Sequence, residues 1–391
     1  MLAQLLEEKR TLIVVGPGGV GKTTTAAAFA VQAARMGKKT LVLTVDPARR
    51  LANSLGLEEL GNTEVRIAPE LFAEAGIPLE NGGALYGMML DTKSTFDDLI
   101  ERYAPNAETR RKIFDNAFYQ QASTALAGSQ EYMAMEKLYE IREQRDYDLI
   151  VLDTPPTSNA LDFLSAPDRL EDFLGSPATR ALVKGMKAAG RVGLGFLKFN
   201  TFVMRGLNRF VGADTFLGIL EFVQSFSEMY AGFKARARRV REILRADDVG
   251  FVIVTSTNRT TIDEGTFFYE QLASHGMPFG AVVVNRVRTP FLAPDELEGL
   301  ERRLIEAARD SEALASADGY HVQQFLKRGA EHCRDYEIMA QVDADRLALV
   351  KERFAGNEDR IYPVPQLERD VHDVGSLAEF AERVTSVQGA A

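Results

Sequence analysis

One short segment constrains this chain more than any other, since residues 16–23 have the sequence GPGGVGKT. It fits the pattern G-x-x-x-x-G-K-[ST], whose glycines let successive backbone N–H groups turn inward around phosphate groups. A β-branched run at 11–15 precedes it and an alanine-rich helical stretch at 25–36 follows it. A helix placed there points its positive end at the phosphates. The alternative is a chance glycine turn, and the strand-loop-helix setting favours a phosphate-binding loop.

The loop predicts how a nucleoside triphosphate and Mg²⁺ are held. Lys22 would reach the β- and γ-phosphates and act as a catalytic residue, the Thr23 hydroxyl would ligate Mg²⁺, and Thr24 could bind an α-phosphate. The predicted nucleotide-binding residues of the loop are Gly18, Gly19, Val20, Gly21, Lys22, Thr23 and Thr24.

Two aspartates end apolar runs elsewhere in the chain. Asp153 follows the run at 149–152 and precedes a Thr-Pro-Pro-Thr loop, where its carboxylate could serve Mg²⁺ and the prolines could stiffen a γ-phosphate sensor. Asp46 follows the run at 40–45 and could orient or deprotonate the attacking water. The structural alternatives are a turn aspartate at 153 and a helix N-cap at 46. We predict that Asp153 is a metal ligand and that Asp46 is catalytic.

Short β-branched runs alternate with helical patterns, as is typical of βαβ units in a doubly wound, mostly parallel α/β sheet. The runs lie at 11–15, 40–45, 147–153, 251–255, 281–285 and 360–364. About a hundred residues separate the second run from the third and the third from the fourth, and both intervals are mainly helical in pattern. We predict a single P-loop domain over 1–391, with a helical lobe formed by insertions at about 95–140 and 170–245.

The second insertion has an unusual composition. Between residues 176 and 212 there are seven Lys or Arg residues and no Asp or Glu, interleaved with Phe and Met. Adaptable apolar side chains beside cations could bind a hydrophobic client across residues 186–233. Alternatively, the apolar residues pack inward and the cations form a solvated face. Both interpretations remain open at this point.

Composition disfavours several other classes of protein. A net charge of -10 argues against a nucleic-acid partner. The single cysteine, Cys333, can form neither an intrachain disulfide nor a CxxC metal clip. The N-terminal residues 1–10 do not resemble a signal peptide, and no run of 18 apolar residues could span a membrane. We therefore expect a cytoplasmic protein whose membrane contact, if any, is peripheral.

Three motifs together resemble the deviant-Walker ATPases. They are GGVGKTT at 18–24, Asp-Pro-Ala at 46–48, and Asp-Thr-Pro-Pro-Thr at 153–157, which continues to 164 like a second switch. Within this class the chain is most similar, as a bacterial-type member, to the branch that holds the arsenite-pump ATPase and the Get-pathway ATPase that targets tail-anchored membrane proteins. The run ending at Asn285 looks like that branch's adenine-recognition strand, and the segment from Pro363 to Pro365 resembles its loop near the purine.

The resemblance implies a Mg²⁺-dependent ATP hydrolase that works as a nucleotide-switched dimer. Its helical lobes would form a composite hydrophobic surface that binds, targets or chaperones a client, such as a membrane-protein segment. By the same resemblance, Asp46 would activate water in the first switch, Asp153 would lie on the Mg²⁺ side, and Asn285 would read adenine.

The chain departs from this branch in two respects. The family's signature lysine directly follows the first loop glycine and reaches across the dimer, but here that position is Pro17, which has neither charge nor N–H. Either another basic residue compensates or a paralogous partner subunit supplies the lysine, so a homodimer and a heterodimer both stay open. In addition, one cysteine cannot build a thiolate arsenite site or an inter-subunit zinc clamp, which disfavours an arsenite pump.

Two other functions stay open. A MinD- or ParA-like spatial regulator would use the same loop, although such proteins usually lack an insertion as long as 176–245. A non-catalytic nucleotide-binding subunit of a heterodimer is compatible with Pro17. The residues that favour hydrolysis are intact, namely Lys22, Thr23, Asp46 and Asp153.

Overall fold

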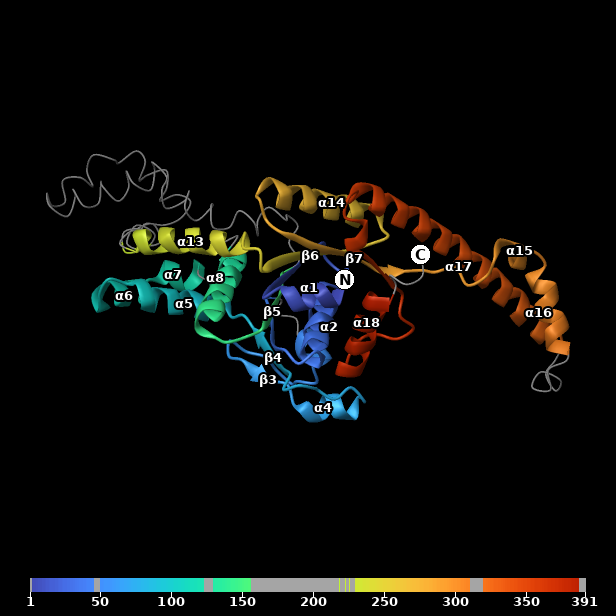
Figure 1. Cartoon of the computed structure of the whole chain (residues 1–391), viewed down its shortest axis with the longest axis horizontal. Coiled ribbons are helices and arrows are strands. Elements are labelled where there is room, and N and C mark those ends of the chain that lie inside the picture. The colour runs from blue at the N-terminus through green and yellow to red at the C-terminus, as the bar shows by residue number, and fades with distance from the viewer. Residues whose placement is uncertain are drawn as a thin grey trace.

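The computed structural model describes residues 2–45, 50–122, 129–155, 229–309 and 319–386, together with Gly218, Phe222 and Ser225. Within these residues the strands form one eight-stranded sheet of order β3-β4-β2-β5-β1-β6-β7-β8 (Figure 1). The strands are β1 (Thr11–Val15), β2 (Lys39–Thr44), β3 (Val65–Arg66), β4 (Ala84–Met89), β5 (Leu149–Asp153), β6 (Val249–Ser256), β7 (Phe279–Val287) and β8 (Ile361–Pro365). Neighbours pair in parallel except β3 with β4, which confirms the predicted doubly wound, mostly parallel α/β fold.

Helices cover both faces of the sheet, and this explains why β1 and β5 are buried along their whole length. Successive residues of β1 face opposite sides: Leu12 belongs to one hydrophobic core cluster and Ile13 to the other. On the Leu12 side pack α1 (Leu2–Glu8), α2 (Lys22–Arg35), α3 (Arg50–Ser54), α4 (Pro69–Glu74) and α18 (Val374–Ser386). On the Ile13 side pack α8 (Ser129–Gln144), α13 (Tyr230–Leu244), α14 (Arg259–Ser274) and the end of α17 (Gly319–Arg353).

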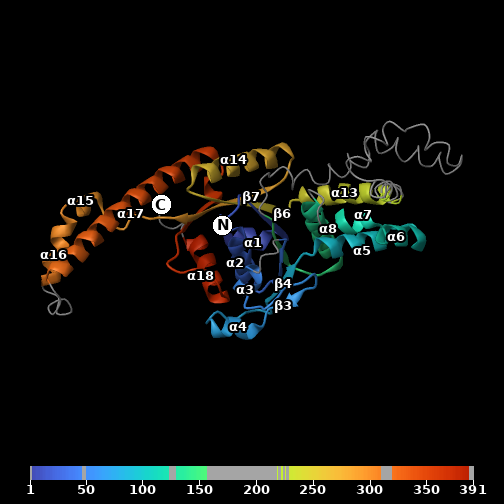
Figure 2. The ribbon, with the colours of Figure 1, turned by 180° about the vertical axis from the view of Figure 1, so that it is seen from behind.

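A helical lobe extends from one end of the sheet. It contains α5 (Thr92–Tyr103), α6 (Ala107–Phe114) and α7 (Ala117–Ala122), with α8 and α13 beside them (Figures 1 and 2). These helices overlap the predicted first insertion at about 95–140. Much of the predicted second insertion, at about 170–245, lies outside the described residues, and so does the basic stretch 176–212. The two-insertion lobe and the single-domain boundaries therefore stay predictions.

A buried ion pair joins α13 to α8 in this lobe. The Glu136 carboxylate, 1% exposed, accepts hydrogen bonds from Arg236 Nε at 2.6 Å and from the Tyr132 hydroxyl at 2.5 Å. Arg236 also donates to the Tyr103 hydroxyl at 2.8 Å and lies over the Tyr139 ring. Burial raises the pKa of Glu136, and the neighbouring guanidinium opposes that shift. These contacts hold α13 against α5 and α8.

The sequence analysis missed a pair of strands and a helical arm. The interval between the second and third predicted strands is mainly helical, as predicted, but it also contains the strands β3 and β4, which were not predicted. The sequence of β4, ALYGMM, has no β-branched residue, and its strand state comes from parallel pairing with β2. The arm consists of α15 (Pro294–Leu297), α16 (Leu300–Arg309) and the 35-residue α17, and it lies opposite the lobe in both views (Figures 1 and 2).

Among the described helices, none is both long enough and apolar enough to cross a bilayer.

Candidate active site

The loop between β1 and α2 takes the shape that the sequence predicts. Gly16, Gly19 and Gly21 have φ angles of 147°, 77° and 99°, which are values that favour glycine. A Cβ at Gly16 would lie 2.1 Å from the Val254 carbonyl oxygen, so the loop begins in close contact with β6. Because α2 begins at Lys22, the first backbone N–H groups of that helix lie beside the loop.

Lys22 lies inside this loop rather than in solvent. It is 6% exposed, and its Nζ donates hydrogen bonds to the carbonyl oxygens of Gly16 at 3.0 Å and Pro17 at 2.9 Å. The ammonium group is thus held where the loop closes, close to the backbone groups that would surround phosphates. This position is compatible with the predicted phosphate contact.

Asp153 joins three elements at the end of β5. Its Oδ2 accepts hydrogen bonds from the hydroxyls of Thr23 and Thr44, each at 2.8 Å, and its side chain is fully buried. The register explains this meeting, because Asp153 lies opposite Val14 on β1 and opposite Thr44 on β2. The structure therefore brings together the two predicted metal ligands, Thr23 and Asp153. Their hard oxygen atoms fit Mg²⁺ well.

Thr44 was not predicted as a site residue. It is the last residue of β2, and the only signal in the sequence was a hydroxyl at the end of a predicted buried strand, two positions before Asp46. Thr154 supports the same region, because its Oγ1 donates to the Val14 carbonyl oxygen at 2.8 Å and ties the end of β5 to β1.

The predicted purine-side residues lie at the same edge of the sheet as the loop. Asn285 is near the end of β7, and its Nδ2 donates to the Val20 carbonyl oxygen of the loop at 2.8 Å. Pro363 and Pro365 lie in β8, opposite Val284 and Val287 of β7. Segments far apart in sequence therefore converge on one edge, since parallel strands present their carboxyl ends together.

Some predicted residues cannot be placed. Asp46 lies outside the described residues, as do residues 156–164 of the segment that resembles a second switch. The catalytic role of Asp46 remains a prediction. Gly18 and Gly19 are exposed at the tip of the loop, and Thr24 is half-buried in the first turn of α2.

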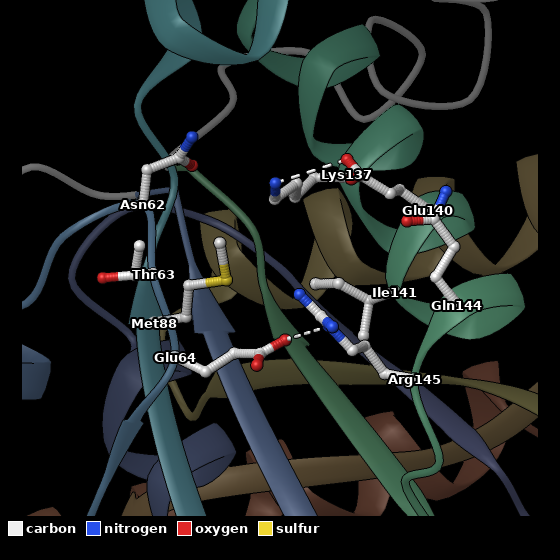
Figure 3. A pocket seen from close by; sticks show the side chains of 9 residues that line it. All are labelled: Asn62, Thr63, Glu64, Met88, Lys137, Glu140, Ile141, Gln144 and Arg145. Atoms are coloured by element: carbon white, nitrogen blue, oxygen red, sulfur yellow. Dashed lines mark hydrogen bonds and ion pairs between the residues drawn. The ribbon is translucent and has the colours of Figure 1, made fainter. Parts of the chain in front are cut away.

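A separate cavity of about 200 Å³ lies between the β3–β4 edge and α8 (Figure 3). Its lining residues are Asn62, Thr63, Glu64, Met88, Lys137, Glu140, Ile141, Gln144 and Arg145. Its charged groups pair with one another, with Arg145 and Glu64 at 3.1 Å and Lys137 and Glu140 at 3.3 Å. A charged ligand would have to displace these pairs. None of the predicted site residues that the structure describes lines this cavity, so we do not assign it to the nucleotide.

Three features define this protein as a P-loop nucleoside triphosphatase. A glycine loop encloses Lys22, Thr23 lies at the start of a helix, and Asp153 ends the adjacent parallel strand. A family model described as "Anion-transporting ATPase" matches residues 9–304, and the chain belongs to that family. It is an ATPase, and ATP is its nucleotide. The predicted resemblance to the branch of the arsenite-pump and Get-pathway ATPases is confirmed.

Curated relatives agree with the family model. The chain is 25% identical to "ATPase GET3" of Malassezia globosa over 291 residues, 74% of this chain and 76% of that protein. It is 24% identical to "ATPase get3" of Neurospora crassa over 311 residues, covering 78% and 81% of the two chains. It is 26% identical to "ATPase get3" of Aspergillus terreus over 285 residues, covering 72% and 74%.

Proposed function

We propose that this ATPase is a nucleotide-switched dimer that binds hydrophobic membrane-protein segments in the cytoplasm and targets or chaperones them. One observation carries the proposal: a long interval of the chain separates Asp153, in the nucleotide site, from α13, which the Glu136–Arg236 pair holds against α8 of the lobe. The sequence between them contains the basic, Phe- and Met-bearing stretch 176–212. The similarity to proteins named "ATPase GET3" supports the same function.

Within the site, the chain's own residues would divide the work of hydrolysis. Lys22 would leave its carbonyl partners for the β- and γ-phosphates, and the backbone N–H groups from Gly18 to Thr24 would surround them. Asp46 would orient and activate the attacking water. Thr23 and Asp153 would hold Mg²⁺, which when bound neutralises charge on the phosphate oxygens.

Client binding would depend on dimerisation, because one lobe offers a smaller apolar surface than two lobes brought together. The lobe begins close to the strand that carries Thr44, since α5 begins three residues after β4 and β4 pairs with β2. The Leu90 backbone N–H donates to the Thr44 carbonyl oxygen at 2.8 Å, which links the start of the lobe to a residue that holds Asp153.

The decisive experiment combines mass and client binding. Light scattering on the full chain with ADP, and with a non-hydrolysable ATP analogue plus Mg²⁺, should show a dimer that forms or compacts with the analogue. A fluorescent peptide with one apolar helix of about 20 residues should bind under the same condition. The matched peptide carries two central lysines and should not bind, and Lys22→Met protein should bind neither nucleotide nor peptide. Equal binding of both peptides, or binding independent of nucleotide, would refute the proposal.

A heterodimer with a paralogous ATPase is the second candidate, and Pro17 favours it. A proline at that position cannot provide a charge to a partner's nucleotide. If the purified chain stays monomeric with the ATP analogue, a paralogous chain that retains the lysine should restore dimer formation and hydrolysis on mixing.

A further inference from the structure

A β-bulge interrupts the pairing of β7 with β8 beside the nucleotide loop. Val284 lies opposite Pro363 and Val287 opposite Pro365, so three steps along β7 match two steps along β8. The extra residue falls at Asn285 or Arg286, and Arg286 has a φ of 60°, a left-handed value that is uncommon for arginine. The two residues of the edge strand β8 that flank the bulge, Pro363 and Pro365, are prolines, which supply no N–H to the ladder there. Bulges of this kind commonly redirect a side chain next to an active site.

The redirected side chain is that of Asn285, and both ends of its amide are engaged. Its Oδ1 accepts a hydrogen bond from the Arg286 backbone N–H at 2.9 Å, which the left-handed turn brings within reach. Its Nδ2 donates to the Val20 carbonyl oxygen at 2.8 Å. Because an N–H can only donate and a carbonyl can only accept, these two partners determine the orientation of the amide.

The contact is close as well as buried. Asn285 is 6% exposed, and a Cβ at Gly21 would lie only 2.4 Å from Asn285 Nδ2. Gly21 also has a φ of 99° and directly precedes Lys22 at the start of α2. Any residue larger than glycine would push the amide away from the loop. The loop shape and the position of Asn285 are therefore mutually dependent.

We infer that Asn285 is a positioning residue for the phosphate loop, held by the bulge so that its amide keeps the Val20–Gly21 peptide in the phosphate-binding shape. The inference deepens the proposed nucleotide site and rests on it. A side-chain amide has two N–H groups and two oxygen lone pairs, so one N–H and one lone pair remain for a base. Reading adenine alone would make Asn285 matter only for ligands that have a base. If Asn285 holds the loop, its loss should also weaken the binding of a ligand that has phosphates but no base.

A ligand without a base separates these two roles. Calorimetric titrations of the full chain with inorganic tripolyphosphate and with ATP, both with Mg²⁺, would be compared for wild type, Asn285→Ala and Asn285→Leu. Leucine keeps the branched volume of asparagine without its hydrogen bonds, so it is the variant to use if alanine impairs folding. We expect tripolyphosphate to bind about three- to tenfold more weakly, as the loss of one hydrogen bond predicts, and ATP binding to weaken by at least the same factor.

Ser256→Ala is the matched control, because Ser256 lies opposite Asn285 at the end of β6 and bonds Thr261 rather than the loop. It should bind both ligands as wild type does. Titrations are made well below each variant's melting temperature, so a loss of stability alone would not change the tripolyphosphate affinity. An unchanged tripolyphosphate affinity with weakened ATP binding would overturn the inference and leave Asn285 as a base reader. Failure of wild type to bind ATP would instead refute the nucleotide site itself.

Discussion

Lys22 donates a hydrogen bond to the carbonyl oxygen of Pro17 at 2.9 Å, so the loop lysine is held by the residue that replaces the family's signature lysine. The contact uses the backbone of residue 17 and not its side chain. A different side chain at this position would therefore leave the Lys22 contact possible. The catalytic consequence of Pro17 can be tested separately from the integrity of the loop.

The first prediction concerns Pro17→Lys. If the chain works as a homodimer, the new ammonium group should reach the partner's nucleotide and raise the hydrolysis rate at least tenfold, because a charge supplied in trans stabilises the transition state of phosphoryl transfer. Steady-state phosphate release measures the change. Pro17→Ala frees the backbone without adding charge and should leave the rate within twofold of wild type. Equal rates for the two variants would show that no partner nucleotide is reached from this position.

The second prediction concerns Thr44, which sequence reasoning missed. Thr44→Val keeps the shape of the side chain but removes a buried donor to the Asp153 carboxylate, an interaction worth about 1.5–3 kcal/mol for a charged acceptor. We expect weaker Mg²⁺ binding. The Mg²⁺ concentration that half-saturates ADP binding should rise at least threefold, because Asp153 is less well oriented. The control is Thr40→Val on the same strand, where Oγ1 donates to the Lys38 carbonyl oxygen at 3.4 Å and not to Asp153. If both variants behave alike, Thr44 acts on stability and not on the site.

The third prediction concerns the buried pair in the helical lobe. Glu136 and Arg236 have side chains that are 1% and 10% exposed, so Arg236→Met or Glu136→Gln should each lower the free energy of unfolding by about 3–5 kcal/mol by leaving one buried charge without its partner. The double variant should cost clearly less than the sum of the two. Urea denaturation of the four proteins gives the coupling energy. Additive losses would contradict a direct interaction between the two charges.

The fourth prediction concerns the cap of α18, the helix that packs against α2. Asp373 Oδ1 accepts from the Ser376 backbone N–H at 2.7 Å and from its hydroxyl at 2.8 Å. These bonds, with His372 adding to the effect, lower the pKa of Asp373 below its ordinary value of 3.8. The folded state therefore favours the ionised form. The resulting stability is present above about pH 4 and is lost as the pH falls through the lowered pKa.

Asp373→Ala should cost about 1 kcal/mol of unfolding free energy at pH 7, a typical value for a lost N-cap. The difference from wild type should shrink as the pH falls below 4. Asp373→Asn is the control, since it retains an acceptor but does not titrate. Urea melts between pH 3 and pH 7 provide the comparison, and a pH-independent difference for Asp373→Ala would show that the carboxylate charge contributes nothing.

Local patterns in the sequence were sufficient for the phosphate loop and most of the sheet. The glycines before Lys22 could be assigned without knowing their tertiary contacts, because this local pattern is typical of a phosphate-binding loop. The six predicted strands match β1, β2, β5, β6, β7 and β8, since nearly all of them are β-branched runs buried on both faces. The ATPase activity and the family followed from the same motifs.

The tertiary structure decided what depends on neighbours. The segment ALYGMM forms β4 because its backbone pairs in parallel with β2. Thr44 is a site residue because the register of β2 with β5 places it beside Asp153. The sequence predicted Asn285 at the adenine side, but only the bulge against Pro363 and Pro365 turned its amide onto the loop. A sequence records the spacing of residues along one chain, whereas strand pairing sets which hydrogen-bonding groups from distant segments meet, and this chain's site is assembled by such meetings.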